Sequence, residues 1–479
     1  MIKKIEKTFY GIWCKFNNQN LMSTITLDEI QTCCEEKGLE VISIQETSFG
    51  FNATVPAIKV NTLNGIAIFP RQKLSEIEIY NKNIIPFQNA EEFWHKVDWF
   101  PPLFMSMSDI SRGLDVVSLK IGDHTKYTRE KLQERFEQFF PTVYNFSNII
   151  PITIQTLPNS IAIAKHTPVI KESILAFYSG MRVTAIASLI PIIEDILNTI
   201  LGIKSTDIDL ISKVNHCIDL ANKKITAIHV DHADWIPPEY IDLKVLKVMN
   251  ERIRITELIR DWLTTSFYRN TDEYNNRSGF NRHFFAHAKS EIWQNQSNFF
   301  RAIGLIQALA FIECFAMEET KLSIFPPDPD ERSISFRLDI FACMNIQAIK
   351  NQVLTLLQID NNLPFNPTAS DDGWLNRAAI LSEKMDNQII KKLRDKGWQC
   401  YSFGEPIEDG NYITVNASKG NRTIKIALLY SCATANNIYK ELDKTCDYIL
   451  YQGAYYHQDS FAYGIKNYVG PLNAWLTPE

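Results

Sequence analysis

The chain has 479 residues, of which 49 are lysine or arginine and 55 are aspartate or glutamate, so its formal net charge is −6. This length allows roughly two to four domains with a sizeable core, and a hydrophobic content of 45% is that of an ordinary globular protein. Proteins that bind duplex DNA are commonly basic, so any nucleic-acid site on this acidic chain must be a local basic patch.

Cysteine usage and apolar runs indicate the compartment. The nine cysteines are scattered and form no Cys-x-x-Cys pair, which is typical of reduced thiols in a cytosol. Residues 1–7 carry lysines with no apolar run behind them, so we expect no signal peptide. No apolar stretch of 18 residues is free of charge, so we expect no membrane span and no membrane partner. These features predict a cytoplasmic protein.

Residues 1–150 predict an N-terminal mixed α/β domain, and nothing in this segment indicates its role. Asn64-Gly65 separates two short runs of alternating apolar residues, which is the pattern of a β-hairpin. Apolar spacing predicts a helix over 127–140 that Pro141 closes.

Helical periodicity dominates residues 165–322, which we interpret as an all-α bundle. Apolar residues recur at three- and four-residue spacings over 170–201, where Pro191 is expected to kink or split the helix. Further helices are expected over 243–267, from about 281 onward, and over 298–317. The predicted fold is therefore a multidomain α+β protein with a central all-α bundle between two α/β domains.

Residues 323–369 predict a linker and a connecting helix, and residues 370–479 predict a C-terminal α/β domain. Its expected elements are a helix over 374–396, strands over 398–403, 412–416 and 423–430, a helix over 433–442 and a strand over 448–452. This order is similar to the core of restriction-endonuclease-like domains. Such nucleases hold Mg²⁺ with an aspartate followed by Glu-x-Lys, and the third expected strand lacks that motif. We therefore expect a degenerate domain that binds or regulates and does not cut.

An aromatic cluster lies near the C-terminus, where Tyr451, Tyr455 and Tyr456 are followed by His457 and Tyr463. Aromatic rings at these positions would either stack on nucleic-acid bases or pack in the core of the domain. Both interpretations stay open at this point.

The motif richest in chemistry is Arg282-His-Phe-Phe-Ala-His287, at the expected start of a long helix. Asn281 is a plausible N-cap, so the first free backbone N–H groups and the Arg282 fork would both favour a phosphate. His287 can transfer a proton near neutral pH. Positions five apart on a helix diverge by about 140°, so Arg282 must reach round to meet His287, whereas His283 and His287 share a face.

The pattern also has plainer interpretations. Roughly one Arg-x(4–6)-His match is expected by chance in a chain of this composition, and Arg277 with His283 is a second formal match. Arg277 and Lys289 would serve as nucleic-acid contacts beside the motif or simply as surface charges. The segment from His229 to Asp234 contains imidazoles and carboxylates, but neighbouring side chains on one loop rarely converge on an ion. We expect a solvated loop there and no metal site.

With its surroundings, the motif resembles the HEPN superfamily, whose helical bundles include many RNases of toxin–antitoxin and phage-defence systems. Besides the Arg282/His287 spacing, the run 189–194 is similar to an early helix in which many members place an acidic residue, here Glu194. The run from Asn298 is similar to the last helix of the bundle. The resemblance covers about 165–320, and Ala288 stands where many relatives have glycine.

The resemblance implies a metal-independent endoribonuclease. The RNA 2′-hydroxyl would attack the adjacent phosphorus, with His287 as general acid or base and Arg282 stabilising the phosphoryl oxygens, and the products would be a 5′-hydroxyl and a 2′,3′-cyclic phosphate. His283 would orient the phosphate or pack locally. Glu194 would hydrogen-bond a motif side chain or face solvent.

The resemblance also implies a homodimer with a composite site, an RNA substrate and no cofactor. The predicted role is a toxin or anti-phage effector of abortive infection, with a phage-derived trigger or partner protein. The alternative is a non-catalytic HEPN-like scaffold that binds nucleic acid or protein in a defence complex.

Overall fold

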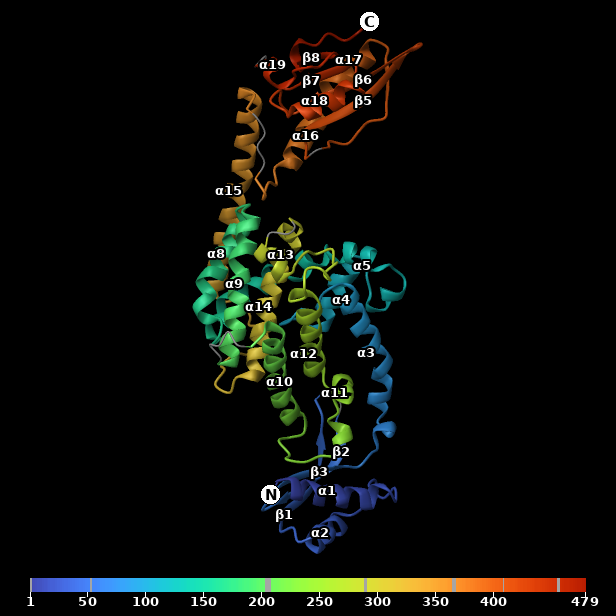
Figure 1. Ribbon diagram of the computed structural model, residues 1–479, viewed down its shortest axis with the longest axis vertical. Helices are drawn as coiled ribbons and strands as arrows, with labels where there is room; N and C mark the ends of the chain where they lie inside the picture. The colour runs from blue at the N-terminus through green and yellow to red at the C-terminus, as the bar shows by residue number, and fades with distance from the viewer. Residues whose placement is uncertain are drawn as a thin grey trace. The chain divides into compact units, whose positions relative to one another are not determined.

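The computed structural model describes residues 2–51, 54–202, 208–287, 291–363, 368–407, 409–454 and 457–479. The protein is mixed α+β, with one sheet of three strands and one of five (Figure 1). It divides into two compact units. The first unit comprises Met1–Ser173 and Thr184–Arg337, and the second comprises Ile174–Val183 and Leu338–Glu479.

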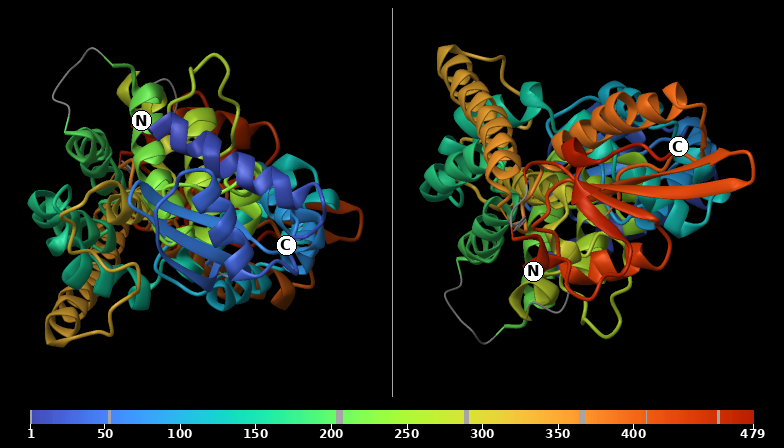
Figure 2. Two further views of the ribbon diagram at one scale, coloured as in Figure 1. Left: turned by 90° about the horizontal axis from the view of Figure 1, so that it is seen from below. Right: turned by 90° about the horizontal axis from the view of Figure 1, so that it is seen from above.

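The first unit begins with two helices and a small antiparallel sheet. These elements are α1 (Ile2–Asn17), α2 (Leu27–Glu36), β1 (Val41–Phe49), β2 (Val55–Thr62) and β3 (Gly65–Pro70), with sheet order β1-β2-β3. The predicted hairpin is confirmed, because β2 pairs with β3 through Thr62 opposite Gly65. Helix α1 crosses one face of the sheet (Figure 2).

The core under this sheet is completed by a distant part of the chain. Trp235 packs against Phe69 and Phe9, with ring centroids 5.4 and 5.7 Å apart. Apolar residues from Val230 to Met249 belong to the same buried cluster as the strands. The small sheet therefore shares its hydrophobic core with residues 230–249, which follow helix α10 (Leu210–His229).

Helices form the rest of the first unit, and residues 174–183 of this helical region belong to the second unit. The helices are α3 (Glu78–Lys96), α4 (Met107–Val116), α5 (Arg129–Phe136), α6 (Phe139–Val143), α7 (Phe146–Pro151), α8 (Thr167–Tyr178), α9 (Arg182–Leu201), α10 (Leu210–His229), α11 (Leu243–Met249), α12 (Glu251–Trp262), α13 (Arg282–His287) and α14 (Gln296–Ala316). Helix α14 lies at the centre, because every residue from Ser297 to Phe315 is buried.

Two of the helices that the structure describes, α9 and α14, are long and apolar enough to cross a membrane. Of their most apolar windows, 50% is buried inside the protein for α9 and 89% for α14. The core helix of a globular protein has the same length and composition, and the burial of α14 is that of a core helix.

The helix expected over 170–201 divides, but at a glycine and not at the proline. Gly180 has a φ of +79°, the left-handed conformation that glycine adopts without steric cost and that commonly ends helices. Pro191 lies inside α9. Its missing N–H removes one backbone hydrogen bond, while its neighbours Ile190 and Ile192 stay buried, so packing holds the helix together.

Three further expectations about helices need correction. Pro141 does not close a helix: it lies in the first turn of α6, where its missing N–H has no partner to lose. Asn250 divides the helix expected over 243–267, because its Oδ1 accepts from the N–H groups of Arg252 and Ile253 and caps α12. Helix α10, capped by Asp209, was not predicted.

The second unit contains the five-stranded sheet. Its elements are most of α15 (Glu331–Asn361), then α16 (Trp374–Lys384), a π-helical segment (Met385–Ile390), α17 (Lys391–Asp395), β4 (Gln399–Tyr401), β5 (Tyr412–Lys419), β6 (Arg422–Leu429), α18 (Asn436–Asp443), β7 (Tyr448–Tyr451), α19 (Gln458–Phe461) and β8 (Tyr468–Pro471). The strand order is β4-β5-β6-β7-β8. The first three strands are antiparallel, and β7 and β8 are added in parallel.

The expected order of elements in this unit is confirmed, and β8 extends it. Strand β6 sends alternate residues to two cores: Ile426 and Leu428 to one face of the sheet, Ala427 and Leu429 to the other. A strand that is buried on both faces reads as a continuous apolar run. Strand β6 therefore carries core residues on both faces and no acidic residue.

Candidate functional site

Helix α13 carries the Arg-x(4)-His motif, and its N-terminus is built as expected. The Oδ1 atom of Asn281 accepts from the backbone N–H of His283 at 2.9 Å and of Phe284 at 3.2 Å, so Asn281 is the N-cap. Its Nδ2 atom donates to the carbonyl oxygens of Ser266 at 2.8 Å and Arg269 at 2.9 Å. Asn281 is 2% exposed, and it fixes the start of α13 to the segment that follows α12.

The expectation of a long helix at this point is wrong. Helix α13 has six residues, and a separate 3₁₀ turn begins at Ile292 before α14. Asn298 explains part of this, because its Nδ2 atom donates to the carbonyls of Trp293 at 3.0 Å and Ser278 at 2.7 Å. These bonds fold the segment before α14 back onto the loop that precedes α13.

A buried polar network lies under that loop. Ser278 donates its hydroxyl to Asp98 at 2.9 Å and lies 2.7 Å from the hydroxyl of Tyr274. Burial raises the pKa of Asp98, although the nearby Arg301 charge opposes the shift. Arg301 is 1% exposed and binds both oxygens of Glu137, at 2.6 and 3.1 Å. The network holds the loop from below, and sequence reasoning identified none of its members.

Arg282 forms an ion pair with Glu194 of α9, 88 residues earlier in the chain. The Nε atom of Arg282 donates to Oε1 of Glu194 at 2.6 Å, and the two side chains are 31% and 33% exposed. The guanidinium makes no other hydrogen bond with the residues that the structure describes. Of the two interpretations of Glu194, the structure thus favours the one in which it binds a motif side chain. Both terminal nitrogens of Arg282 stay available to a ligand.

The two histidines lie on one face of α13, as their spacing predicts. Their rings are nearly parallel, at 5°, with centroids 6.3 Å apart. His287 is exposed and His283 is partly buried. The arrangement presents one imidazole to solvent, one helical turn beyond an arginine whose outer nitrogens are unoccupied.

Tyr268 is a neighbour of the ion pair that the sequence did not indicate. It is 4% exposed, and its hydroxyl has no hydrogen-bond partner among the residues in view. Burial raises its pKa, and the charge of Glu194 raises it further. Tyr268 is therefore a neutral hydroxyl behind the pair at any physiological pH, and a lone tyrosine at the end of an apolar helix carries no sequence signal.

The remaining candidates lie apart from this site. Arg277 is exposed on the loop before α13, with its backbone N–H bonded to Gln133 at 3.2 Å. Lys289 lies outside the described residues, as do Tyr455 and Tyr456.

Tyr451 requires a correction as a nucleic-acid contact. It is 0% exposed in the core of the second unit and donates its hydroxyl to Gln458 at 3.0 Å. Because side chains alternate between the two faces of a strand, the position of Tyr451 in β7 directs its ring into the core of the sheet. Among the described members of the aromatic cluster, His457 and Tyr463 are exposed.

The expected solvated loop from His229 to Asp234 is confirmed in part, because Asp231, His232 and Asp234 are exposed but His229 and Val230 are buried. His229 is 3% exposed beside Asn250, and burial lowers its pKa to about 4. The Asp234 carboxylate accepts from the N–H of Ile66 at 2.8 Å, so the segment is bound to β3. Within the described parts of the chain, no group of three or more histidine, cysteine or acidic side chains is placed to hold a metal ion.

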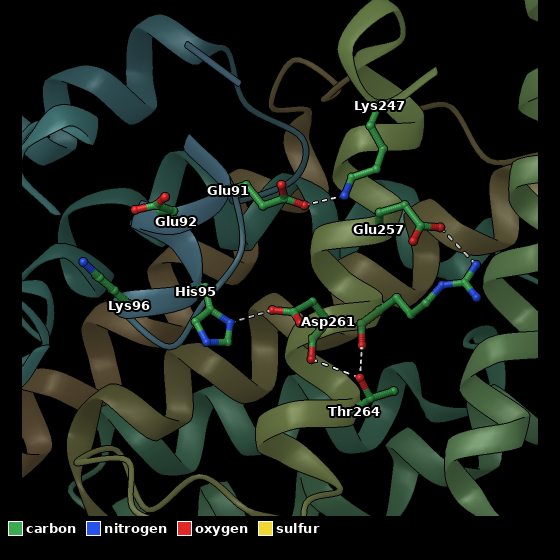
Figure 3. Close-up of a pocket in the computed structure, with 9 residues that line it drawn as sticks. Glu91, Glu92, His95, Lys96, Lys247, Glu257, Asp261 and Thr264 are labelled. Carbon is green, nitrogen blue, oxygen red and sulfur yellow. Dashed lines mark hydrogen bonds and ion pairs between the residues drawn. The ribbon is translucent and has the colours of Figure 1, made fainter. Parts of the chain in front are cut away.

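A polar cleft of about 540 Å³ lies between α3, α11 and α12 (Figure 3). His95 faces Asp261 across it at 2.9 Å, and this hydrogen bond raises the pKa of His95 against the opposing effect of burial. Lys247 pairs with Glu91, and Arg260 pairs with Glu257 at 3.0 Å. The first two of these pairs join α3 to α11 and α12, and the third lies within α12, so the charges that line the cleft are largely paired with one another.

At α13, by contrast, Glu194, Arg282 and His287 are at least partly exposed, and the terminal nitrogens of Arg282 have no partner among the described residues. No protein-family model, curated protein or solved structure matches the chain.

Proposed function

We propose that the protein is a metal-independent endoribonuclease of the HEPN type that acts as a toxin or anti-phage effector. The observation that carries the proposal is the Arg282–Glu194 pair at the start of α13, whose side chains are about one third exposed, with His287 exposed further along the helix. Arginine and histidine side chains suffice to cleave RNA through attack by the RNA 2′-hydroxyl, because that reaction requires charge stabilisation and proton transfer.

Glu194 supports the chemistry by orienting the arginine. It binds Nε alone, so the two terminal nitrogens point away from the carboxylate and match two phosphate oxygens as a fork. Asn281 holds the backbone on one side of this arginine and Glu194 holds its side chain on the other. The guanidinium is thereby ordered before substrate binds, which lowers the entropy lost on binding.

His287 transfers the proton. As base it takes the proton of the 2′-hydroxyl while the 2′-oxygen bonds to phosphorus; the bond from phosphorus to the 5′-oxygen then breaks, and the leaving oxygen takes up a proton. The products are a 2′,3′-cyclic phosphate and a 5′-hydroxyl. One imidazole cannot give and take a proton at once, so a second copy of α13 across a two-fold axis would complete the site, which makes a homodimer part of the proposal.

The test compares purified wild-type protein with Arg282→Ala and His287→Ala on labelled RNA in the presence of EDTA. Each variant should lose about 10²- to 10⁴-fold in cleavage rate, the usual loss of a general acid or base, while EDTA leaves the wild type active. His216→Ala, an exposed histidine on α10, and Arg112→Ala, an exposed arginine on α4, are matched controls. Undiminished cleavage by both motif variants would refute the assignment.

A second candidate function is a non-catalytic scaffold in a defence complex, and one observation favours it: the Arg282 charge is already paired in the absence of substrate. The same cleavage assay decides, because a scaffold yields no cyclic phosphate with the wild type. For the second unit we propose a degenerate restriction-endonuclease-like domain that regulates or binds. Strand β6 carries no acidic residue, and hard cations need oxygen anions at close range, so the full-length protein with Mg²⁺ should not cleave DNA.

A further inference from the structure

A second cavity, of about 860 Å³, lies in the first unit and involves none of the α13 residues. It is lined by the first turn of α12, by α4 and α7, by the loop before α4 and by the segment after α14. Its walls are mainly apolar, with aromatic rings on several sides: Phe51, Phe104, Phe311 and Phe325. A cavity of this size and lining has the dimensions of a site for a small organic molecule.

Arg252 supplies a cation to this cavity; the charge of its neighbour Glu251 acts on it, but no carboxylate of the described residues lies within ion-pair distance. Its guanidinium lies 3.8 Å from the ring centroid of Phe51 and 5.4 Å from that of Phe315. Its side chain makes no ion pair or hydrogen bond with any residue that the structure describes. Arginine stays protonated in proteins, so a positive charge with unused N–H donors lines an apolar space.

Asn148, on α7, also lines the cavity and carries a second unused donor. The residue is 8% exposed, and its Nδ2 atom has no hydrogen-bond partner in the described part of the chain. Its Oδ1 atom is occupied, because it accepts from Nε2 of Gln307 at 3.0 Å. A buried amide N–H without an acceptor is costly, and a bound acceptor would remove that cost.

Two carboxylates also line the cavity, and neither binds Arg252. Asp109 accepts the Ser106 hydroxyl at 2.6 Å and pairs with Arg112. Glu251 lies in the first turn of α12, where the helix dipole favours a negative charge. The donors at Arg252 and Asn148 thus remain for a ligand.

We propose that this cavity binds a small aromatic anion. Its carboxylate, sulfonate or phosphate takes hydrogen bonds from Arg252 and Asn148, and its ring system lies among the phenylalanine side chains. The apolar lining excludes a ligand that is polar throughout, and the guanidinium, which forms no close ion pair with a described residue, favours an anion over a neutral hydrocarbon. The site is independent of the proposed ribonuclease.

The test uses two fluorescent probes that share a body and differ in charge. These are 8-anilinonaphthalene-1-sulfonate and the uncharged N-phenyl-1-naphthylamine, each titrated into the purified full-length protein. Arg252→Gln should weaken binding of the sulfonate by about tenfold, because one charge-assisted hydrogen bond is lost. Its effect on binding of the neutral probe should be less than about twofold. Arg252→Lys keeps the charge and should retain most of the sulfonate affinity. Arg332→Gln, which removes an exposed arginine outside the cavity lining, should alter the binding of neither probe.

The location is tested by Val116→Trp, because Val116 lines the cavity and is 70% exposed, so the larger side chain fills the entrance without entering the core. This variant should weaken both probes. Equal affinity of wild type and Arg252→Gln for the sulfonate overturns the proposal, as does an equal loss for both probes in Arg252→Gln. Unchanged binding of both probes by Val116→Trp places them elsewhere and has the same consequence.

Discussion

Two arginine–glutamate pairs in the first unit use the guanidinium in different ways. Glu137 takes both terminal nitrogens of Arg301, whose side chain is 1% exposed, and Asn298 and Ser297 take further hydrogen bonds from it. Glu194 takes only Nε of Arg282, whose side chain is 31% exposed. The buried pair has both terminal nitrogens of Arg301 bonded within the protein and only its Nε without a partner among the described residues, whereas the surface pair leaves both terminal nitrogens of Arg282 unoccupied.

The comparison shows that the role of an arginine–glutamate pair depends on which hydrogen-bond donors of the guanidinium are left without a partner. A buried charge must be fully paired, since an uncompensated charge in the interior is strongly destabilising. A half-exposed charge can leave donors to water at little cost, and those donors can later bind a phosphate. Arg301 is thus a structural residue and Arg282 a candidate functional one, although the pattern Arg–Glu is common to both.

The largest expected effect is at the buried pair. Arg301→Met leaves Glu137 without its partner in a mostly buried position, so the free energy of unfolding should fall by about 3–5 kcal/mol. Denaturant unfolding followed by circular dichroism measures this. The double variant Arg301→Met/Glu137→Gln should recover part of the loss, because no charge is then left unpaired. A loss below about 1 kcal/mol in the single variant would show that the pair is not needed.

The second prediction extends the comparison to His229, a buried group that is neutral and therefore needs no counter-ion. Burial lowers the pKa of His229 to about 4, whereas an unfolded histidine titrates near about 6.5. Because the pKa of His229 is lower in the folded than in the unfolded protein, the buried neutral ring contributes fully to the free energy of unfolding above the unfolded pKa. This contribution is lost as the pH falls through the folded pKa. At about 1.4 kcal/mol per pKa unit, it amounts to about 3 kcal/mol between pH 7 and pH 4.

The measurement is the free energy of unfolding against pH for wild type and His229→Gln. The wild type should lose stability steeply below pH 6.5, and the variant should lose less over the same interval. His216→Gln, which removes an exposed histidine from α10, should follow the wild-type curve. Parallel curves for wild type and His229→Gln would contradict a depressed pKa at this position.

The smallest expected effect on stability is at the surface pair. Arg282→Gln and Glu194→Gln should each change the free energy of unfolding by less than about 1 kcal/mol, because both side chains are about one third exposed. Glu194→Gln should nevertheless slow RNA cleavage, since the arginine loses its charged anchor, and Arg282→Gln should slow it more. A destabilisation as large as that of Arg301→Met would reassign the surface pair to the structural class.

Local pattern determined several features of this protein from the sequence alone. Gly65 and its neighbours predict the β2–β3 hairpin, Asn281 predicts the cap of α13, and alternating or continuous apolar runs predict the order of elements in the second unit. Each of these depends on interactions between residues close in the chain. Backbone geometry and the solvation of a few side chains therefore suffice to predict them.

Only the tertiary structure decided the rest, because it depends on residues that are far apart in the chain. Glu194 meets Arg282 across 88 positions, Trp235 completes the core under a sheet that ends at Pro70, and Asp98 supports the loop at Ser278. The break at Gly180 in place of Pro191 has a similar origin: packing on both sides of α9 outweighs one missing hydrogen bond. Periodicity shows that a residue is buried or exposed, but the identity of its partner is set by how the helices pack.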